Sequence, residues 1–376
     1  MHGTRPSAFA APDVTPESLL VLGQARSKLL RSQVLIAATR RVRSRPVVGS
    51  MALTAATKTA ALNERNEASL AARPWKQPGY RYRPMSQHAQ EGHDFRATHP
   101  FYGWADVRVD DLSLTMYSNS DDGVAMVYHA FGPDSYEAAS VAIWLEIARV
   151  STKVADVGAF TGLYGMLAQI AMPSAKVIQV EPNSAVRARL SMNLVANDLF
   201  GKISVVPYAV AKEIGTLALH IAWGESILDT GSSLIAPNAP DWLPVRTEIV
   251  TAAPLDLILP QHDLSAPDLM KIDVEGVEHI ALAGLRQTLH SRPTLLLEVQ
   301  GHEKFVACHA ILAEYGYRIY AIDDEALTLI PYDGSGPQEW FARHVGARVL
   351  NYLCVTRDQH FALAERGIGR IRAMMG

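Results

Sequence analysis

Residues 153–162 read KVADVGAFTG, and this stretch decides the fold. An apolar run that contains the acidic residue Asp156 leads into two glycines, Gly158 and Gly162, and an apolar stretch begins at Leu163. Glycine tolerates positive φ and lets the backbone approach another group closely. The pattern therefore predicts a buried strand, a tight turn and a helix, which is the first unit of a nucleotide-binding α/β fold.

The spacing of the two glycines indicates which ligand the turn suits. Dinucleotide-binding folds use Gly-x-Gly-x-x-Gly, whereas this chain has Gly-x-x-x-Gly with an acid two residues before the first glycine. This argues against NAD and favours a ligand with a cationic amino-acid end, such as S-adenosylmethionine. A purely structural turn is the alternative. The candidate cofactor-binding residues here are Asp156, Gly158, Ala159, Phe160, Thr161 and Gly162.

A second candidate strand ends in an acid about one βαβ step later. Residues 176–183 read KVIQVEPN, so Glu181, Pro182 and Asn183 follow the strand directly. A carboxylate at this strand end can accept hydrogen bonds from both ribose hydroxyls of a nucleoside. The alternative is that Glu181 caps the helix that follows. Two acids at successive strand ends together predict a nucleoside site.

The most distinctive string is KIDVEGVEH, residues 271–279, in which Asp273 ends a candidate strand. The next strand carries Glu298 in an otherwise apolar run, and a buried acid must be paired, hydrogen-bonded or neutralised. Both acids are therefore candidate site residues. Glu275 and Glu278 have a plainer interpretation as acids at a helix start.

Apolar runs alternate with helix-like segments after residue 100, which predicts βαβ units and a parallel sheet. A helix over Ser135–Arg149 precedes the first run, and Val107–Tyr117 and Val124–Tyr128 are earlier candidate strands. Thr216–Ile221 and Thr247–Thr251 predict strands that bound an insertion, with a loop over 224–244 between them. The seven main candidate strands are Lys153–Val157, Lys176–Val180, Ile203–Val206, Leu269–Val274, Pro293–Val299, Arg318–Ile322 and Val349–Val355.

With these motifs the chain resembles the FkbM family of S-adenosylmethionine-dependent methyltransferases, from Asp106 to Val355. The resemblance rests on VADVGAFTG (154–162), VEPN (180–183), LDLIL (255–259), KIDVEGVE (271–278) and LEV (297–299). It implies an α/β fold with a Rossmann-like seven-stranded class I methyltransferase sheet. It also implies O-methylation of a hydroxyl on a sugar, glycan, polyketide or related metabolite. Family members commonly have Asn-Ile-Gly where this chain has Phe160, Thr161 and Gly162.

An aliphatic hydroxyl must lose its proton as it accepts a methyl group, so a general base is expected. Asp273 is the first candidate, because the methyl group should project toward the end of its strand; Glu298 is the second and His302 the third. Mg²⁺ held by Asp273 and Glu298 is a weaker alternative. The histidines show no zinc-binding spacing, so no metal ligands are assigned.

Charge divides the chain into two parts. Residues 1–100 carry 15 Lys and Arg against 6 Asp and Glu, whereas the remainder carries 20 against 32. We therefore expect a basic N-terminal extension with a Pro-rich linker over residues 1–99 and the methyltransferase domain over 100–376. Leucines from Leu19 onward lie on one side of a possible basic helix. Residues 19–45 could thus associate with a membrane surface or an acidic partner, or form a solvated arm.

Composition limits the remaining choices. With 48% hydrophobic and 19% charged residues the chain is globular, and no apolar stretch is long enough for a membrane span. Two cysteines cannot build a disulfide framework, so we expect a cytoplasmic protein. Aromatic residues are 7% and are not interleaved with basic ones in the core half, which disfavours nucleic acid. A small molecule or glycan is the expected substrate, and the oligomeric state stays open.

Three other functions stay open. The acceptor could be an amine, a protein or a nucleic acid that docks on the basic extension. The chain could be a non-enzymatic scaffold with a methyltransferase fold. An NAD-dependent dehydrogenase is a third possibility, which the spacing of Gly158 and Gly162 disfavours.

Overall fold

The computed structural model describes residues 48–83, 89–222, 228, 244–345 and 351–375. The chain divides into two units, Met1–Lys58 and Thr59–Gly376, and the second contains every described strand. The possible basic helix within residues 19–45 lies outside the described residues.

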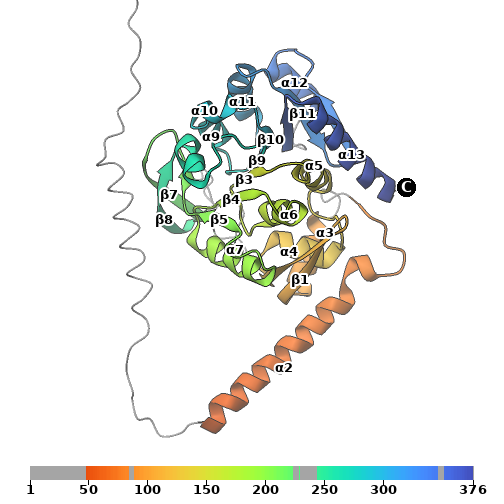
Figure 1. Cartoon of the computed structure of the whole chain (residues 1–376). Helices are drawn as coiled ribbons and strands as arrows, with labels where there is room; N and C mark the ends of the chain where they lie inside the picture. The colour runs from red at the N-terminus through yellow and green to blue at the C-terminus, as the bar shows by residue number, and fades with distance from the viewer. Residues whose placement is uncertain (1–47, 84–88, 223–227, 229–243, 346–350, 376) are drawn as a thin grey trace, which may run out of the picture. The chain divides into compact units, whose positions relative to one another are not determined.

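An eight-stranded sheet forms the centre of the second unit (Figure 1). Five neighbouring strands of this sheet, β10, β9, β3, β4 and β5, run parallel to one another. Strand β13 is antiparallel to both of its neighbours, β10 and β11. This Rossmann-like arrangement confirms the expected fold class. In spatial order the strands are β12 (Thr328–Pro331), β11 (Arg318–Asp323), β13 (Asn351–Val355), β10 (Thr294–Glu298), β9 (Leu269–Ile272), β3 (Lys153–Val157), β4 (Lys176–Val180) and β5 (Ile203–Val206).

The expected count of seven strands is wrong by one. All seven expected strands are present, and β12 adds an eighth by pairing antiparallel with β11 at the edge of the sheet. Strand β12 is short and none of its side chains is fully buried, so it lacks the continuous apolar run that marks the parallel strands.

Two apolar clusters cover the two faces of the sheet. In β3, Val154 belongs to one cluster, and Ala155 and Val157 belong to the other. Strands buried on both faces read as continuous apolar runs, which is why their limits are close to those expected. Helices α5 (Ala138–Ala148), α6 (Leu163–Ala171), α7 (Ser184–Ala196) and α13 (Asp358–Met375) contribute to the first cluster; α8 (Leu255–Ile258), α9 (Glu278–Ala283), α10 (Arg286–Leu289), α11 (His302–Ala313) and α12 (Pro337–His344) contribute to the second (Figure 1).

Two elements before the main sheet differ from expectation. The run Val124–Tyr128 is part of helix α4 (Gly123–Phe131), because Asp122 accepts a hydrogen bond from Ala125 N at 3.0 Å and caps it. A five-residue apolar run fits both periodicities, and the cap decides between them. The single expected strand over 107–117 is instead a hairpin of β1 (Tyr102–Val109) and β2 (Leu112–Asn119).

The described residues between 59 and 99 contact the rest of the unit that contains the main sheet. Helix α2 (Val48–Ala72) contributes Ser69, whose Oγ donates to His99 O at 2.8 Å and lies 2.9 Å from His129 Nε2. Farther along, the Tyr82 hydroxyl donates to Asp134 O at 2.8 Å. The stretch expected to be a Pro-rich linker includes two short helices, η1 (Pro74–Lys76) and α3 (Ala89–Thr98). The domain boundary at residues 99 and 100 stays a prediction.

The insertion after β5 forms a small sheet of its own. Strands β6 (Ala209–Val210), β8 (Pro244–Ala253) and β7 (Gly215–Ala222) lie in that order, and β7 and β8 include both of the expected strands. The expected loop over 224–244 lies almost entirely outside the described residues.

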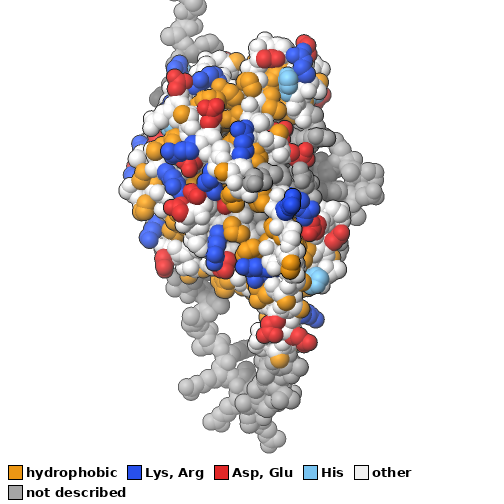
Figure 2. All heavy atoms as spheres, turned by 90° about the vertical axis from the view of Figure 1, so that its right-hand side faces the viewer, with side chains coloured by type: hydrophobic (Ala, Val, Ile, Leu, Met, Phe, Trp, Pro, Cys, Tyr) orange, Lys and Arg blue, Asp and Glu red, His pale blue; other side chains and the backbone are white. Residues whose placement is uncertain are grey.

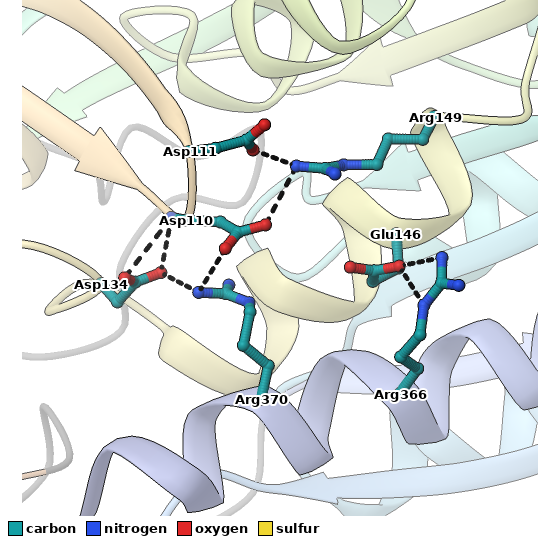
Figure 3. Close-up of polar contacts among 7 residues, drawn as sticks. All are labelled: Asp110, Asp111, Asp134, Glu146, Arg149, Arg366 and Arg370. Carbon is teal, nitrogen blue, oxygen red and sulfur yellow. Dashed lines mark hydrogen bonds and ion pairs between the residues drawn. The ribbon is translucent and has the colours of Figure 1, made fainter.

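The C-terminal helix α13 packs closely on α5. A Cβ atom on Gly367 would lie 2.7 Å from Ala142 O, so glycine permits the close approach of the two helices. Figure 3 shows the ion pairs beside this contact: Arg366 Nε donates to Glu146 Oε2 at 2.6 Å, and Arg370 Nη1 to Asp134 Oδ1 at 3.0 Å. Arg370 also pairs with Asp110, and Arg149 pairs with Asp110 and Asp111 at the hairpin turn. These contacts fix α5 in place.

Charges of both signs share the surface. On the face shown in Figure 2, Lys and Arg side chains are interspersed with Asp and Glu side chains. Among the described residues, none of the helices is apolar over a length that would cross a membrane.

Candidate active site

One cavity opens at the carboxyl ends of β3, β4, β9 and β10. Its lining includes every cofactor-binding residue expected from the sequence, together with Asp273 and Glu298. His302 is not among the lining residues; it begins α11, and its ring centroid lies 6.1 Å from that of Phe341. The expected residues in the lining are Asp156, Gly158, Ala159, Phe160, Thr161, Gly162, Glu181, Pro182, Asn183, Asp273 and Glu298.

The glycine turn after β3 is held from both sides. Gly158 N and Ala159 N donate to Val180 O at 2.9 and 3.1 Å. Gly158 has a φ of +79°, and a Cβ atom there would lie 1.6 Å from Asp273 O. Glycine was expected here because it lets a ligand approach the backbone. The structure gives a further reason, which is that the backbone following β9 occupies the space where a side chain would be.

Asp156 accepts a hydrogen bond from the first turn of α6 and so connects β3 to that helix. Its side chain is 1% exposed, and its Oδ2 accepts hydrogen bonds from Gly165 N at 2.9 Å and Gln179 Nε2 at 3.0 Å. Burial raises the pKa of Asp156 above its ordinary value. The residue therefore orders the turn and also forms part of the cavity wall.

Glu181 lies at the end of β4 with both carboxylate oxygens engaged. Oε1 accepts from Asn183 N at 2.8 Å and Oε2 from Phe160 N at 3.0 Å. Burial raises the pKa of Glu181 to about 7. The alternative that Glu181 caps α7 is wrong, because Asn183 is the N-cap, with its Oδ1 accepting from Ala185 N at 3.0 Å.

A buried cation lies among the acids at the β9 end of the cavity. Lys271 is 4% exposed, forms an ion pair with Asp273, and places its Nζ 4.5 Å from the centroid of the Tyr164 ring. Burial acts to lower the pKa of Lys271, but the carboxylates of Asp273 and Glu137 outweigh it, so that this pKa lies above its ordinary value. Lys271 is therefore charged and offsets part of the negative charge around it.

Two further acids face the same end. Gln300 Nε2 donates to Glu275 Oε2 at 3.1 Å and to Glu298 Oε1 at 3.4 Å. Burial, followed by the charge of Asp273, raises the pKa of Glu275 to about 8 and that of Glu298 well above its ordinary value. This end of the cavity thus combines one cation with several carboxyl groups, and burial favours the protonated form of Glu275 and Glu298.

The cavity also contains residues that sequence reasoning missed. Glu137 precedes α5, and its carboxylate accepts a hydrogen bond from the Tyr164 hydroxyl at 2.5 Å. Tyr136 and Tyr208 also contribute to the wall. No short motif marks these positions, because they come from segments that the fold brings to the sheet edge.

Metal binding was a minor expectation for this site. Within the described ranges, no group of three or more His, Cys, Asp or Glu side chains has an arrangement that would hold a metal ion.

Comparison with known proteins identifies the class. Residues 156–319 match the family model of the methyltransferase FkbM domain. Residues 156–319 are therefore similar to the FkbM methyltransferase domain, as the resemblance predicted, although the resemblance was expected over a longer stretch, from Asp106 to Val355. A comparison with curated protein sequences found no match.

Several solved methyltransferase structures are similar at low identity. The precorrin-6y C5,15-methyltransferase of Geobacter metallireducens GS-15 is 12% identical over 59% of this chain and 89% of its own, with a TM-score of 0.33. The SAM-dependent O-methyltransferase of Thermotoga maritima is 12% identical over 59% and 66%, with a TM-score of 0.32. The O-methyltransferase of a trans-AT PKS multienzyme of Brevibacillus brevis, in complex with S-adenosyl-L-homocysteine, is 12% identical over 63% and 77%, with a TM-score of 0.31.

Proposed function

We propose that this protein transfers the methyl group of S-adenosylmethionine to a hydroxyl group of a sugar, glycan or polyketide-like metabolite. One observation carries the proposal: a single cavity joins Glu181 at the end of β4 to Asp273 after β9, with the glycine turn between them. The FkbM domain supports a methyltransferase that uses this cofactor.

The side chains that line the cavity suit the cofactor. Glu181 is 7% exposed and lies where it can accept hydrogen bonds from ribose hydroxyls. Acidic residues outnumber the one lysine in the lining, and a net negative wall attracts a ligand that carries a sulfonium and an ammonium group. When bound, the cofactor supplies an electrophilic methyl group, and the chain supplies binding, orientation and proton removal.

Asp273 is the proposed general base. The acceptor hydroxyl loses its proton to the Asp273 carboxylate while its oxygen forms the bond to the methyl carbon. Such a base typically contributes ~10²–10⁴-fold to the rate. Lys271 holds that carboxylate through the ion pair, and its own stem is buried, so the orientation of Asp273 is fixed. Glu298 is the second candidate base, and His302, outside the lining, is the third.

An amine acceptor is the second candidate. The excess of carboxyl groups beside Asp273 favours it, because such a wall stabilises a cationic ammonium group as well as a neutral hydroxyl.

A labelled-transfer screen tests the proposal. The full chain is incubated with S-adenosylmethionine carrying a ¹³C-methyl group and with fractionated extracts of metabolites and glycans, and products are found by mass spectrometry. We expect a product whose mass rises by one labelled methyl group and whose fragments place that group on oxygen. A methyl on nitrogen would favour the amine alternative. Saturable cofactor binding without a labelled product in any fraction would favour a non-enzymatic scaffold.

A further inference from the structure

Glu137 has an unusual backbone conformation directly before α5. Its φ is 39° and its ψ is 51°, which is the left-handed region. A non-glycine residue in this region costs roughly 1 kcal/mol or more and persists only where its surroundings hold it. Glu137 also precedes the segment that the FkbM family model matches.

The side chain of Glu137 does not cap the helix that follows it. Its position is that of the N-cap, but it makes no side-chain hydrogen bond to α5. Instead, Ala139 N donates to Asp324 Oδ1 at 2.8 Å, so the turn between β11 and β12 supplies the cap. The carboxylate of Glu137 is thereby available to the cavity, which it lines.

Contacts place this carboxylate at the β9 end of the cavity. Its Oε2 accepts from the Tyr164 hydroxyl at 2.5 Å, and its charge acts on Lys271 of β9 and on Glu298 of β10. Within the described part of the chain, no other hydrogen bond to the Glu137 carboxylate is present. It therefore retains the capacity to accept a hydrogen bond from a ligand.

Glu137 directly precedes α5, a helix that is held firmly in the fold. Helix α5 is buried along its whole length and is locked to α13 at Gly367 and by the Arg366–Glu146 ion pair (Figure 3). A carboxylate on such a base is held in one position relative to Asp273, which is a requirement for recognising a second group near a reacting atom.

We propose that Glu137 binds the methyl acceptor, accepting a hydrogen bond from a hydroxyl or ammonium group that neighbours the reacting oxygen. With the carboxylate of Asp273 it forms an acidic wall that rejects acceptors with an anionic group near the reacting oxygen. The inference rests on the proposed function and adds a residue and a charge preference to it. Uncharged polyols and amino sugars fit such a wall, whereas sugar phosphates do not.

The test compares wild type with Glu137→Gln, which keeps the shape of the side chain and removes its charge. Calorimetry with S-adenosylmethionine and with S-adenosylhomocysteine comes first. We expect both dissociation constants to stay within about threefold of wild type. If wild type bound neither S-adenosylmethionine nor S-adenosylhomocysteine, the proposed function itself would be contradicted. Loss only in Glu137→Gln would overturn the inference, since it would assign the residue to the cofactor.

Acceptor binding is then measured by saturation-transfer NMR on protein loaded with S-adenosylhomocysteine. The probes are methyl β-D-glucopyranoside, D-glucosamine and D-glucose 6-phosphate, which share one ring and differ in charge. We expect wild type to bind the first two and to bind the phosphate at least tenfold more weakly. Glu137→Gln should weaken the first two about tenfold, because the amide oxygen is an uncharged and therefore weaker hydrogen-bond acceptor than the carboxylate.

Asp324→Asn is the matched control, because Asp324 supports the same helix end without lining the cavity. It should leave binding of the pyranosides within about twofold of wild type. An equal loss in Asp324→Asn and Glu137→Gln would show that Glu137 is structural and would overturn the inference. Binding of the phosphate as tight as that of the neutral ring would do the same, as would absence of binding of both uncharged and cationic probes.

Discussion

A Cβ atom on Gly158 would lie 1.6 Å from the carbonyl oxygen of Asp273. The turn after β3 and the segment after β9 are therefore in direct backbone contact. In the proposed function the first holds the cofactor and the second holds the base. Because neither segment can shift without the other, the two halves of the site are positioned together.

Replacing Gly158 by alanine should destabilise the protein strongly. Real Cβ atoms almost never approach another atom this closely, and the positive φ adds strain, so we expect a loss of about 3 kcal/mol or more in the free energy of unfolding. Gly201→Ala is the matched control, because Gly201 has a φ of +82° and no atom within 4 Å of its hypothetical Cβ. It should lose only about 1 kcal/mol. Equal urea midpoints for the two variants would refute this explanation.

Cofactor affinity should depend on pH through Glu181. The pKa of Glu181 is raised to about 7 by burial, and ribose hydroxyls donate to the ionised carboxylate. Binding therefore favours loss of the proton, so affinity for S-adenosylmethionine should fall as the pH drops below about 7, by up to roughly tenfold per pH unit. Glu181→Gln should bind more weakly and without this dependence. Calorimetry from pH 5.5 to 8.5 provides the check, and an unchanged pH profile in the variant would remove Glu181 from the cofactor site.

Replacing Asp273 by asparagine should separate binding from turnover. The amide keeps the size of the side chain but cannot take a proton, so methyl transfer should fall ~10²–10⁴-fold. Affinity for S-adenosylmethionine should stay within a few fold. Single-turnover transfer on the acceptor found in the labelled screen supplies the rate. Wild-type turnover in Asp273→Asn would assign the proton to another group, and Glu298→Gln would be the next variant to measure.

Lys271 should contribute more to stability than a surface lysine. Lys271→Met leaves the carboxylates of Asp273, Glu137 and Glu298 without their cation, and breaking a buried pair costs about 3–5 kcal/mol. The loss should be smaller at pH 5 than at pH 8, because burial raises the pKa of the neighbouring Glu275 to about 8, so that this carboxyl group takes up a proton as the pH falls. Urea unfolding at the two pH values tests both points.

The control is Lys176→Met, which breaks an exposed pair with Asp263. It should change stability little, because exposed pairs are screened by water. A similar small effect from both lysine variants would mean that Lys271 does not neutralise the cavity acids.

Sequence alone predicted the elements whose environment is uniform. The parallel strands are buried on both faces, so each reads as an apolar run between turn residues, and the limits of β3 and β4 agree with the structure to the residue. The acids Asp156, Glu181 and Asp273 could be predicted to lie together because they follow strands of one parallel sheet, whose carboxyl ends share an edge.

Other elements depend on contacts that are remote in sequence. The run Val124–Tyr128 is equally apolar as a strand or a helix, and the cap from Asp122 decides the outcome. Glu137 could not be recognised as a cavity residue, because it stands at the N-cap position of α5, where the sequence suggests a capping acid, and Asp324 from far along the chain supplies the cap instead. Tertiary contacts of this kind leave no local signal.

Calorimetric titration of the full chain with S-adenosylmethionine and, separately, with NADH tests the central claim most directly. We predict saturable binding of one S-adenosylmethionine per chain and no binding of NADH, because the glycine turn and the acidic wall suit a cationic ligand rather than a pyrophosphate. Saturable binding of NADH together with no heat from S-adenosylmethionine would contradict the claim.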